Sequence, residues 1–180
     1  MSGPVHAPAP SAIEQHTGGG PLAVLSLDPG VTTGICLGRY SDNTLVLTPC
    51  QEQLSLLGLH EYLDMFKRAN EQWHTLHIVY EDFSYRNQAR RGLDLTPVKL
   101  IGVIEMHKEM FEPFISYTKQ SAAAGKGFYS DEKLKDLGVY VAGLQHGRDA
   151  TRHLLQWANF GAGSAWMNLE DTKVVLDLDD

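Results

Sequence analysis

Apolar residues follow two different periods along the chain, and these periods predict strands and helices in turn. Short apolar runs bounded by turn residues predict five strands, at 22–27, 35–40, 44–48, 75–81 and 113–117. The first run ends at the turn signal Asp28-Pro29-Gly30. The first three runs are close enough in sequence to form an antiparallel meander.

Apolar residues at helical spacing fill the stretches between and after these strands. They predict four helices, at 58–70, from Pro97 to about 110, at 130–137 and at 146–160. Two other stretches are expected to be loops: a polar one at 84–94 and a small-residue one at 121–127 that contains Lys126. This order of elements predicts a mixed sheet covered by helices, an α/β domain.

Composition divides the chain into three parts. Residues 1–20 are rich in Pro and Gly and predict a flexible tail, because such a composition buries little apolar surface. Residues 21–162 have the length of one domain that can bury an ordinary core. Residues 163–180 are interpreted as an acidic C-terminal tail.

Charge and cysteine content narrow the classes of protein that fit. The chain of 180 residues carries 15 Lys and Arg against 22 Asp and Glu, a net charge of −7, which argues against a protein held on nucleic acid by bulk charge. An enzyme with local basic groups and acidic metal ligands still fits. Cys36 and Cys50 are too few for a disulfide framework and suit a reducing compartment. No membrane-spanning run or signal peptide is visible, so a soluble cytoplasmic protein is expected.

Acidic residues end the two most apolar strands. Asp28 closes the first strand and Glu81 closes the one at 75–81, and ligand sites in α/β sheets lie at strand ends. Asp82 follows directly, but the strand period points it to the opposite face. Each acid also has an ordinary interpretation, Asp28 as a turn former before Pro-Gly and Glu81 as a strand-end acid facing water.

A second polar group opens the last predicted helix. His146 and Asp149 are three residues apart, so both project from one face, which His153 continues one turn later. The helix dipole would also stabilise an Asp there without any ligand. The candidate catalytic and metal-binding residues are Asp28, Glu81, His146 and Asp149. Such hard ligands suit Mg²⁺ or Mn²⁺ better than zinc, and two ions about 4 Å apart would clamp a phosphodiester for attack by water.

Five segments then carry a resemblance to a known family. They are L-S-L-D-P-G-V-T-T-G (25–34), I-V-Y-E-D-F (78–83), V-K-L-I-G-V-I-E (98–105), Q-S-A-A-A-G-K-G-F with E-K-L-K (120–135), and H-G-R-D-A-T-R-H (146–153). In these segments the chain resembles the RuvC family of Holliday-junction resolvases, in the divergent form common in phage genomes. The resemblance implies an RNase H-like fold, a homodimer, and Mg²⁺-dependent nicking of four-way junctions in branched DNA.

The resemblance also assigns roles to single residues. It implies that Asp28, Glu81 and Asp149 are the family's metal-binding acids and that His146 stands where relatives have Asp or His. The residues that it implies as phosphate contacts are Lys126 and Lys133, with Lys119 as a rival. An ordinary solvated surface position is the alternative for each lysine.

The segment after Glu81 resembles the place where the family carries an aromatic residue that wedges at the junction. Core packing suits Phe83, whereas Tyr85 is the candidate for stacking on an unpaired base. The basic residues that could meet phosphates in the same run are Arg86, Arg90 and Arg91. The alternative is a merely solvated loop.

Other functions fit parts of the sequence. The segment 28–34 also resembles the phosphate loop of sugar kinases and actin-like ATPases, but those need two such domains, and no second Gly-rich phosphate motif follows. A branched-DNA binding protein, or a broader flap and branch nuclease, would share the fold and the acidic residues. This chain is more acidic than RuvC relatives usually are, so its junction binding is expected to be sensitive to salt.

Overall fold

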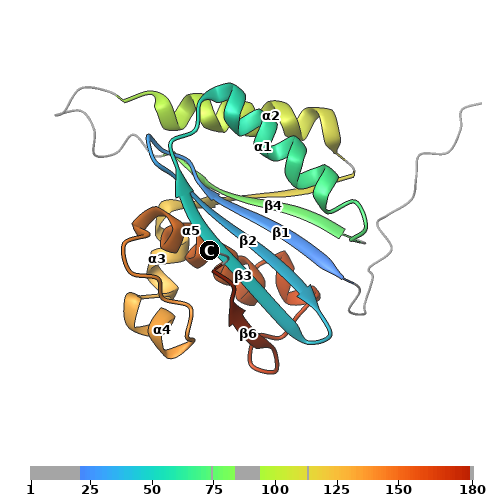
Figure 1. Cartoon of the computed structure of the whole chain (residues 1–180), viewed down its shortest axis with the longest axis vertical. Helices are drawn as coiled ribbons and strands as arrows, with labels where there is room; N and C mark the ends of the chain where they lie inside the picture. Colours follow the sequence, from blue (N-terminus) through green and yellow to red (C-terminus); the bar gives the residue numbers. More distant parts are fainter. Residues whose placement is uncertain (1–20, 74, 84–93, 113, 179–180) are drawn as a thin grey trace, which may run out of the picture.

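A six-stranded mixed sheet forms the centre of the molecule (Figure 1). The computed structural model describes residues 21–73, 75–83, 94–112 and 114–178. The strands stand in the order β5-β4-β1-β2-β3-β6. Their bounds are Leu22–Asp28 for β1, Thr33–Ser41 for β2, Thr44–Glu52 for β3, Thr75–Asp82 for β4, Ser116–Ser121 for β5 and Lys173–Leu176 for β6.

The first three strands form the predicted antiparallel meander. Asp42 and Asn43, both at positive φ, make the two-residue turn between β2 and β3, as the twist of a tight hairpin requires. On the other side of β1 the sheet is parallel, because β4 pairs with β1 and β5 pairs with β4 in the same direction. The carboxyl ends of β1 and β4 therefore reach the same edge of the sheet.

Helices cover both faces of the sheet (Figure 1). On one face lie α1 (Leu56–Ala69) and α2 (Thr96–Phe111), which starts with Pro97 in its first turn as predicted. On the other face α5 (Gln145–Phe160) packs against β1, β2 and β3, with two short helices beside it. These are α3 (Ala122–Phe128) and α4 (Asp131–Asp136). Within the described ranges, no helix is long and apolar enough to cross a membrane.

Strand alternation divides the core into two layers. Leu25 and Leu27 of β1 pack toward α1 and α2, whereas Val24 packs with residues of α5. In β4, Ile78 and Tyr80 belong to the first layer and Val79 to the second. Because side chains alternate with a period of two, the face on which the last residues of β1 and β4 lie follows from the layers of the residues before them.

The structure corrects three sequence-based predictions. The stretch 121–127 is not a loop, because α3 occupies it, and its run of three alanines is a strong helix former. The fifth strand begins at Ser116 rather than 113, because the backbone N–H groups of Phe114 and Ile115 still donate to the carbonyl oxygen of Phe111. Residues 163–180, interpreted as an acidic tail, contain β6, which was not predicted and which pairs with β3.

Candidate active site

Two neighbouring strands deliver carboxylates to one face of the sheet. Asp28 ends β1 and Glu81 lies near the end of β4, one position beyond the last pair of the parallel register, Leu27 with Tyr80. Both acids fall on the face covered by α5, as their alternation with Val24 and Val79 requires. Asp82 falls on the other face, where its carboxylate lies 3.7 Å from the Lys119 ammonium.

Two glycines bring the start of α5 against the sheet. Gly34 pairs with Asp28 across β1 and β2, and a Cβ built on it would lie 1.9 Å from the carbonyl oxygen of His146. A Cβ on Gly147 would lie 2.8 Å from the carbonyl oxygen of Cys50. Only residues without side chains permit this approach. It explains physically why the last glycine of D-P-G-V-T-T-G accompanies the acid six residues earlier.

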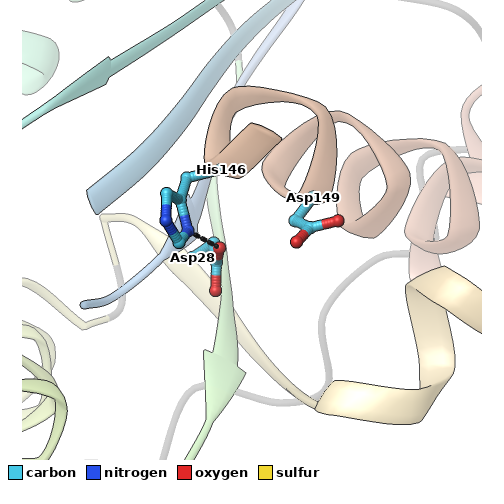
Figure 2. Close-up of side chains that lie close together, drawn as sticks. All are labelled: Asp28, His146 and Asp149. Carbon is cyan, nitrogen blue, oxygen red and sulfur yellow. Dashed lines mark hydrogen bonds and ion pairs between the residues drawn. The ribbon is translucent and has the colours of Figure 1, made fainter. Parts of the chain in front are cut away.

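The approach places His146 and Asp149 of α5 beside Asp28 (Figure 2). Each of the three offers one ligand atom, and these atoms all lie within 4.8 Å of one another. His146 Nδ1 lies 3.1 Å from Asp28 Oδ2. Asp149 is buried, and the side chain of Asp28 is only 13% exposed. Oxygen and imidazole ligands gathered this closely could hold a divalent metal ion.

Burial and neighbouring charges shift the pKa values of Asp28 and Lys126 at this site. The pKa of Asp28 is raised above its usual value, first by burial and then by the carboxylates of Glu81 and Asp149, although the hydrogen bond with His146 lowers it. Burial lowers the pKa of Lys126, but its hydrogen bond and ion pair with Asp149, and the nearby charges of Glu81 and Asp28, raise it overall. Clustered carboxylates of this kind favour a bound cation.

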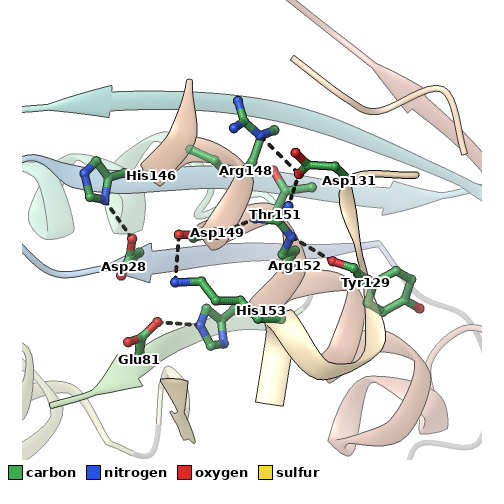
Figure 3. Close-up of polar contacts among 12 residues, drawn as sticks. Asp28, Glu81, Tyr129, Asp131, His146, Arg148, Asp149, Thr151, Arg152 and His153 are labelled. Carbon is green, nitrogen blue, oxygen red and sulfur yellow. Dashed lines mark hydrogen bonds and ion pairs between the residues drawn. The ribbon is translucent and has the colours of Figure 1, made fainter. Parts of the chain in front are cut away.

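Glu81 stands apart from the group of three and has its own partner on α5 (Figure 3). His153 Nε2 lies 2.8 Å from Glu81 Oε2, and His153 Nδ1 lies 2.7 Å from Gln120 Oε1. The structure therefore brings Asp28, His146 and Asp149 together directly. Glu81 reaches them through its charge, which acts on Asp28.

Asp149 is held by two cations (Figure 3). Lys126 Nζ lies 3.0 Å from Asp149 Oδ2, and Arg152 donates to Asp149 Oδ1. The same guanidinium donates to Asp131 of α4 and, over 2.7 Å, to the carbonyl oxygen of Tyr129. An open cavity of about 310 Å³ lies here, lined by Lys126, Tyr129, Ser130, Asp131, Gln145, Arg148, Asp149 and Arg152.

Of the other predicted DNA contacts, the structure describes Lys133, Lys119 and Phe83. Lys133 donates to the carbonyl oxygen of Phe128 over 2.7 Å and so caps the end of α3. Lys119 projects from β5 to the α2 face, where its ammonium lies 2.9 Å from Glu105. Phe83 is half-buried just after β4. The remaining candidates lie outside the described residues: Tyr85, Arg86, Arg90 and Arg91.

Three contributing residues were missed by reasoning from the sequence. His153 was noticed only as a continuation of the helix face, whereas Arg152 and Gln120 were not considered. The helical spacing of Asp149 and Arg152, three residues apart, is a local signal for their ion pair. No local signal exists for Gln120, which meets His153 from a strand 33 residues away.

Comparison with known proteins identifies the fold. No family model matches the sequence, and no curated protein matches it. Among solved structures, RuvC of Thermus thermophilus superposes with a TM-score of 0.52 at 15% identity, covering 79% of this chain and 97% of that one. The chain has the fold of the RuvC resolvases. Both the RuvC resemblance and the predicted RNase H-like sheet are thus confirmed at the level of the fold.

Two further structures agree with this result. T. thermophilus RuvC in complex with Holliday junction substrate gives a TM-score of 0.53 at 14% identity, covering 76% of this chain and 92% of that one. The yeast mitochondrial Holliday junction resolvase Ydc2 gives 0.51 at 13% identity, covering 74% and 76%. Similarity at identities this low establishes a shared architecture only. The function has to be inferred from the site residues of this chain.

Proposed function

We propose that this protein is a metal-dependent endonuclease that nicks four-way DNA junctions. The observation that carries the proposal is the convergence of Asp28, His146 and Asp149, with Glu81 beside them, at the carboxyl edge of the central strands. Asp28 of β1 and the α5 residues meet there although they are far apart in sequence, and the charge of Glu81 on β4 acts on Asp28. The likeness to RuvC in complex with Holliday junction substrate supports branched DNA as the substrate class.

The donor set fits Mg²⁺ or Mn²⁺. The residues that would hold the metal are Asp28, Glu81, His146 and Asp149, and we propose two ions per site. Three carboxylates and one imidazole, without a thiolate, are hard ligands. Burial first, and then the carboxylates of Glu81 and Asp149, raise the pKa of Asp28, so a bound cation would stabilise its charged form. When bound, such ions supply the positive charge that makes water nucleophilic and stabilises the leaving oxygen of a phosphodiester.

The protein's own residues position the DNA and the ligands. Lys126 is about half exposed and lies 3.0 Å from Asp149, so its ammonium can reach a phosphate that enters the site. The contact of His146 Nδ1 with Asp28 Oδ2, at 3.1 Å, links the end of β1 to the start of α5. Asp149 is already oriented by Arg152. The protein's own residues therefore orient the carboxylates, and the half-exposed Lys126 ammonium lies beside them.

Paired nicks fall in two opposed strands of a four-way junction, so we propose a homodimer that presents two sites. The other proposed DNA contacts are Lys133, Lys119, Phe83, Tyr85, Arg86, Arg90 and Arg91. Of the three lysines, Lys126 has the best support because it lies beside Asp149. Lys119 has the least, because its ion pair with Glu105 places it on the opposite face of the sheet. Recombination or packaging of phage DNA is the proposed setting.

The proposal is tested by nicking of a labelled four-way junction beside a linear duplex of the same sequence, with Mg²⁺ or Mn²⁺ at low salt. We expect paired, opposed nicks on the junction and their loss in Asp28→Asn. Asp82→Asn is the matched control, because it removes a strand-end carboxylate on the opposite face, and it should nick as the wild type does.

Other results would redirect or overturn the proposal. Equal cleavage of flaps and junctions would indicate a broader branch nuclease. Junction binding without cleavage in both Mg²⁺ and Mn²⁺ would overturn the proposed nuclease activity. The protein would then be a DNA-binding protein on a nuclease fold.

A further inference from the structure

The buried imidazole of His153 joins three elements at the inner side of the site. Its side chain is fully buried, and its ring lies between Glu81 of β4 and Gln120 of β5. Glu81 and Gln120 are paired across these neighbouring strands, so both side chains face α5. The ring thus bridges the two strands to the helix that carries His146 and Asp149. Figure 3 shows its contact with Glu81.

The orientation of Gln120 defines which nitrogen of the ring carries hydrogen. Gln120 Nε2 donates to the backbone carbonyl oxygen of His153 over 3.2 Å, so Gln120 Oε1 is the atom that faces the ring. An amide oxygen can only accept, and therefore His153 Nδ1 must donate. The remaining nitrogen, Nε2, lies within hydrogen-bond distance of Glu81 Oε2, at 2.8 Å.

We propose that His153, oriented by Gln120, is a positioning residue for Glu81. The imidazole holds one oxygen of the carboxylate, so that the second oxygen can serve as a metal ligand. This inference rests on the proposed function, in which Glu81 binds metal. Arg152 likewise holds one oxygen of Asp149, Oδ1, whereas Oδ2 is paired with Lys126.

An ordinary structural role is the competing interpretation, because a buried histidine with two partners also stabilises the fold. The two roles differ in what they change. Partners that orient metal ligands typically contribute 10- to 100-fold, an order-of-magnitude range, to metal affinity. A purely structural imidazole would change the free energy of unfolding and leave the affinity of the folded protein for metal as it was.

The chain offers a matched control in His77. It precedes Glu81 by four residues in β4, so its side chain lies on the same face of the sheet. His77 is buried, accepts or donates one hydrogen bond with Thr118 of β5 at 2.9 Å, and packs against Trp157 of α5 with ring centroids 4.5 Å apart. It therefore bridges the same three elements as His153 without touching Glu81.

The experiment measures Mn²⁺ binding to the full-length protein by electron paramagnetic resonance. Thermal unfolding, monitored by circular dichroism, reports the stability of each variant. His153→Phe keeps a ring but removes both hydrogen bonds, and we expect Mn²⁺ affinity to fall about 10- to 100-fold. His77→Phe should bind Mn²⁺ within about twofold of the wild type. His153→Gln, which can still donate to Glu81, should recover part of the loss. Gln120→Met leaves the imidazole in place and should produce a smaller fall, and it serves as a second test if His153→Phe does not fold.

The outcomes separate this inference from the proposed function. Wild-type Mn²⁺ affinity in folded His153→Phe or, failing that variant, in Gln120→Met would overturn the positioning role, as would an equal fall in His77→Phe. The proposed function would survive that result if Asp28→Asn abolished Mn²⁺ binding. Absence of any Mn²⁺ binding that depends on Asp28 in the wild type would overturn both.

Discussion

Replacing Gly34 with alanine tests whether the close approach of α5 to the sheet builds the site. The new Cβ would lie 1.9 Å from the carbonyl oxygen of His146 and 2.3 Å from its carbonyl carbon, and both are backbone atoms that cannot rotate away. Real Cβ contacts below 3.0 Å are essentially never observed, so the start of α5 must move by at least 3.0 − 1.9 = 1.1 Å.

This movement acts on ligand geometry more than on the fold. His146 Nδ1 now lies 3.1 Å from Asp28 Oδ2, and the displaced carbonyl belongs to the same residue, so the imidazole moves with it. A misplacement of about 1 Å can cost on the order of 100-fold in rate. Overpacking of this kind costs about 1–3 kcal/mol in the free energy of unfolding. We therefore expect junction nicking to fall about 100-fold in a protein that still folds.

The assay is single-turnover nicking of a labelled junction in Mg²⁺, with urea unfolding measured in parallel. Gly102→Ala is the control, because a Cβ at that exposed position of α2 meets nothing within 4 Å. The control should nick normally and gain up to about 1 kcal/mol from its better helix former. Wild-type nicking and an unchanged urea midpoint in Gly34→Ala would refute the inferred close approach.

Three further predictions concern charge and protonation. Arg152→Met should lower the free energy of unfolding by about 3 kcal/mol, because it leaves the buried Asp149 and its neighbour Asp131 short of a cation; a loss below about 1 kcal/mol in urea unfolding would contradict this. Lys126→Met should weaken junction binding and reduce its salt slope by about 1, measured by fluorescence anisotropy in EDTA at several salt concentrations; an unchanged slope would exclude a phosphate contact. Burial lowers the pKa of His77 to about 4 from 6.5, so the unfolded chain takes up this proton first and stability should decline as pH falls through that window, by up to about 3 kcal/mol. Urea unfolding from pH 7 to pH 4 should show a smaller decline in His77→Phe, and an identical decline would assign the effect to other groups.

Local sequence patterns determined most of the framework. Alternating and continuous apolar runs predicted β1 to β4, because which side chains of a strand are buried is visible in the order of its consecutive residues. Helical spacing likewise predicted α1 and α5 to within two residues at each end. The acidic candidates Asp28 and Glu81 followed from the same patterns, since each lies at or next to the end of a strand that its apolar run predicted.

Contacts between distant segments were decided only by the tertiary structure. Asp28 and His146 are 118 residues apart, and Glu81 and His153 are 72 apart, so no window of sequence contains either pair. Their distances depend on how closely α5 packs on β2, which the absence of a side chain at Gly34 permits. The sequence identified Asp28, Glu81 and His146 individually as candidates. Only the packing of α5 on the sheet determines which side chains come into contact.

The misassigned stretches have the same physical cause. Small residues at 122–125 suit a loop or a helix by composition, and contact with α5 selects the helix, since a Cβ on Gly125 would lie 3.1 Å from that of Arg152. The last strand, Lys173–Leu176, contains two valines that favour a strand, but it is only four residues long, and its pairing with β3 holds it in place. Short segments gain too little from local structure to fold by themselves, and their conformation follows from the surface on which they pack.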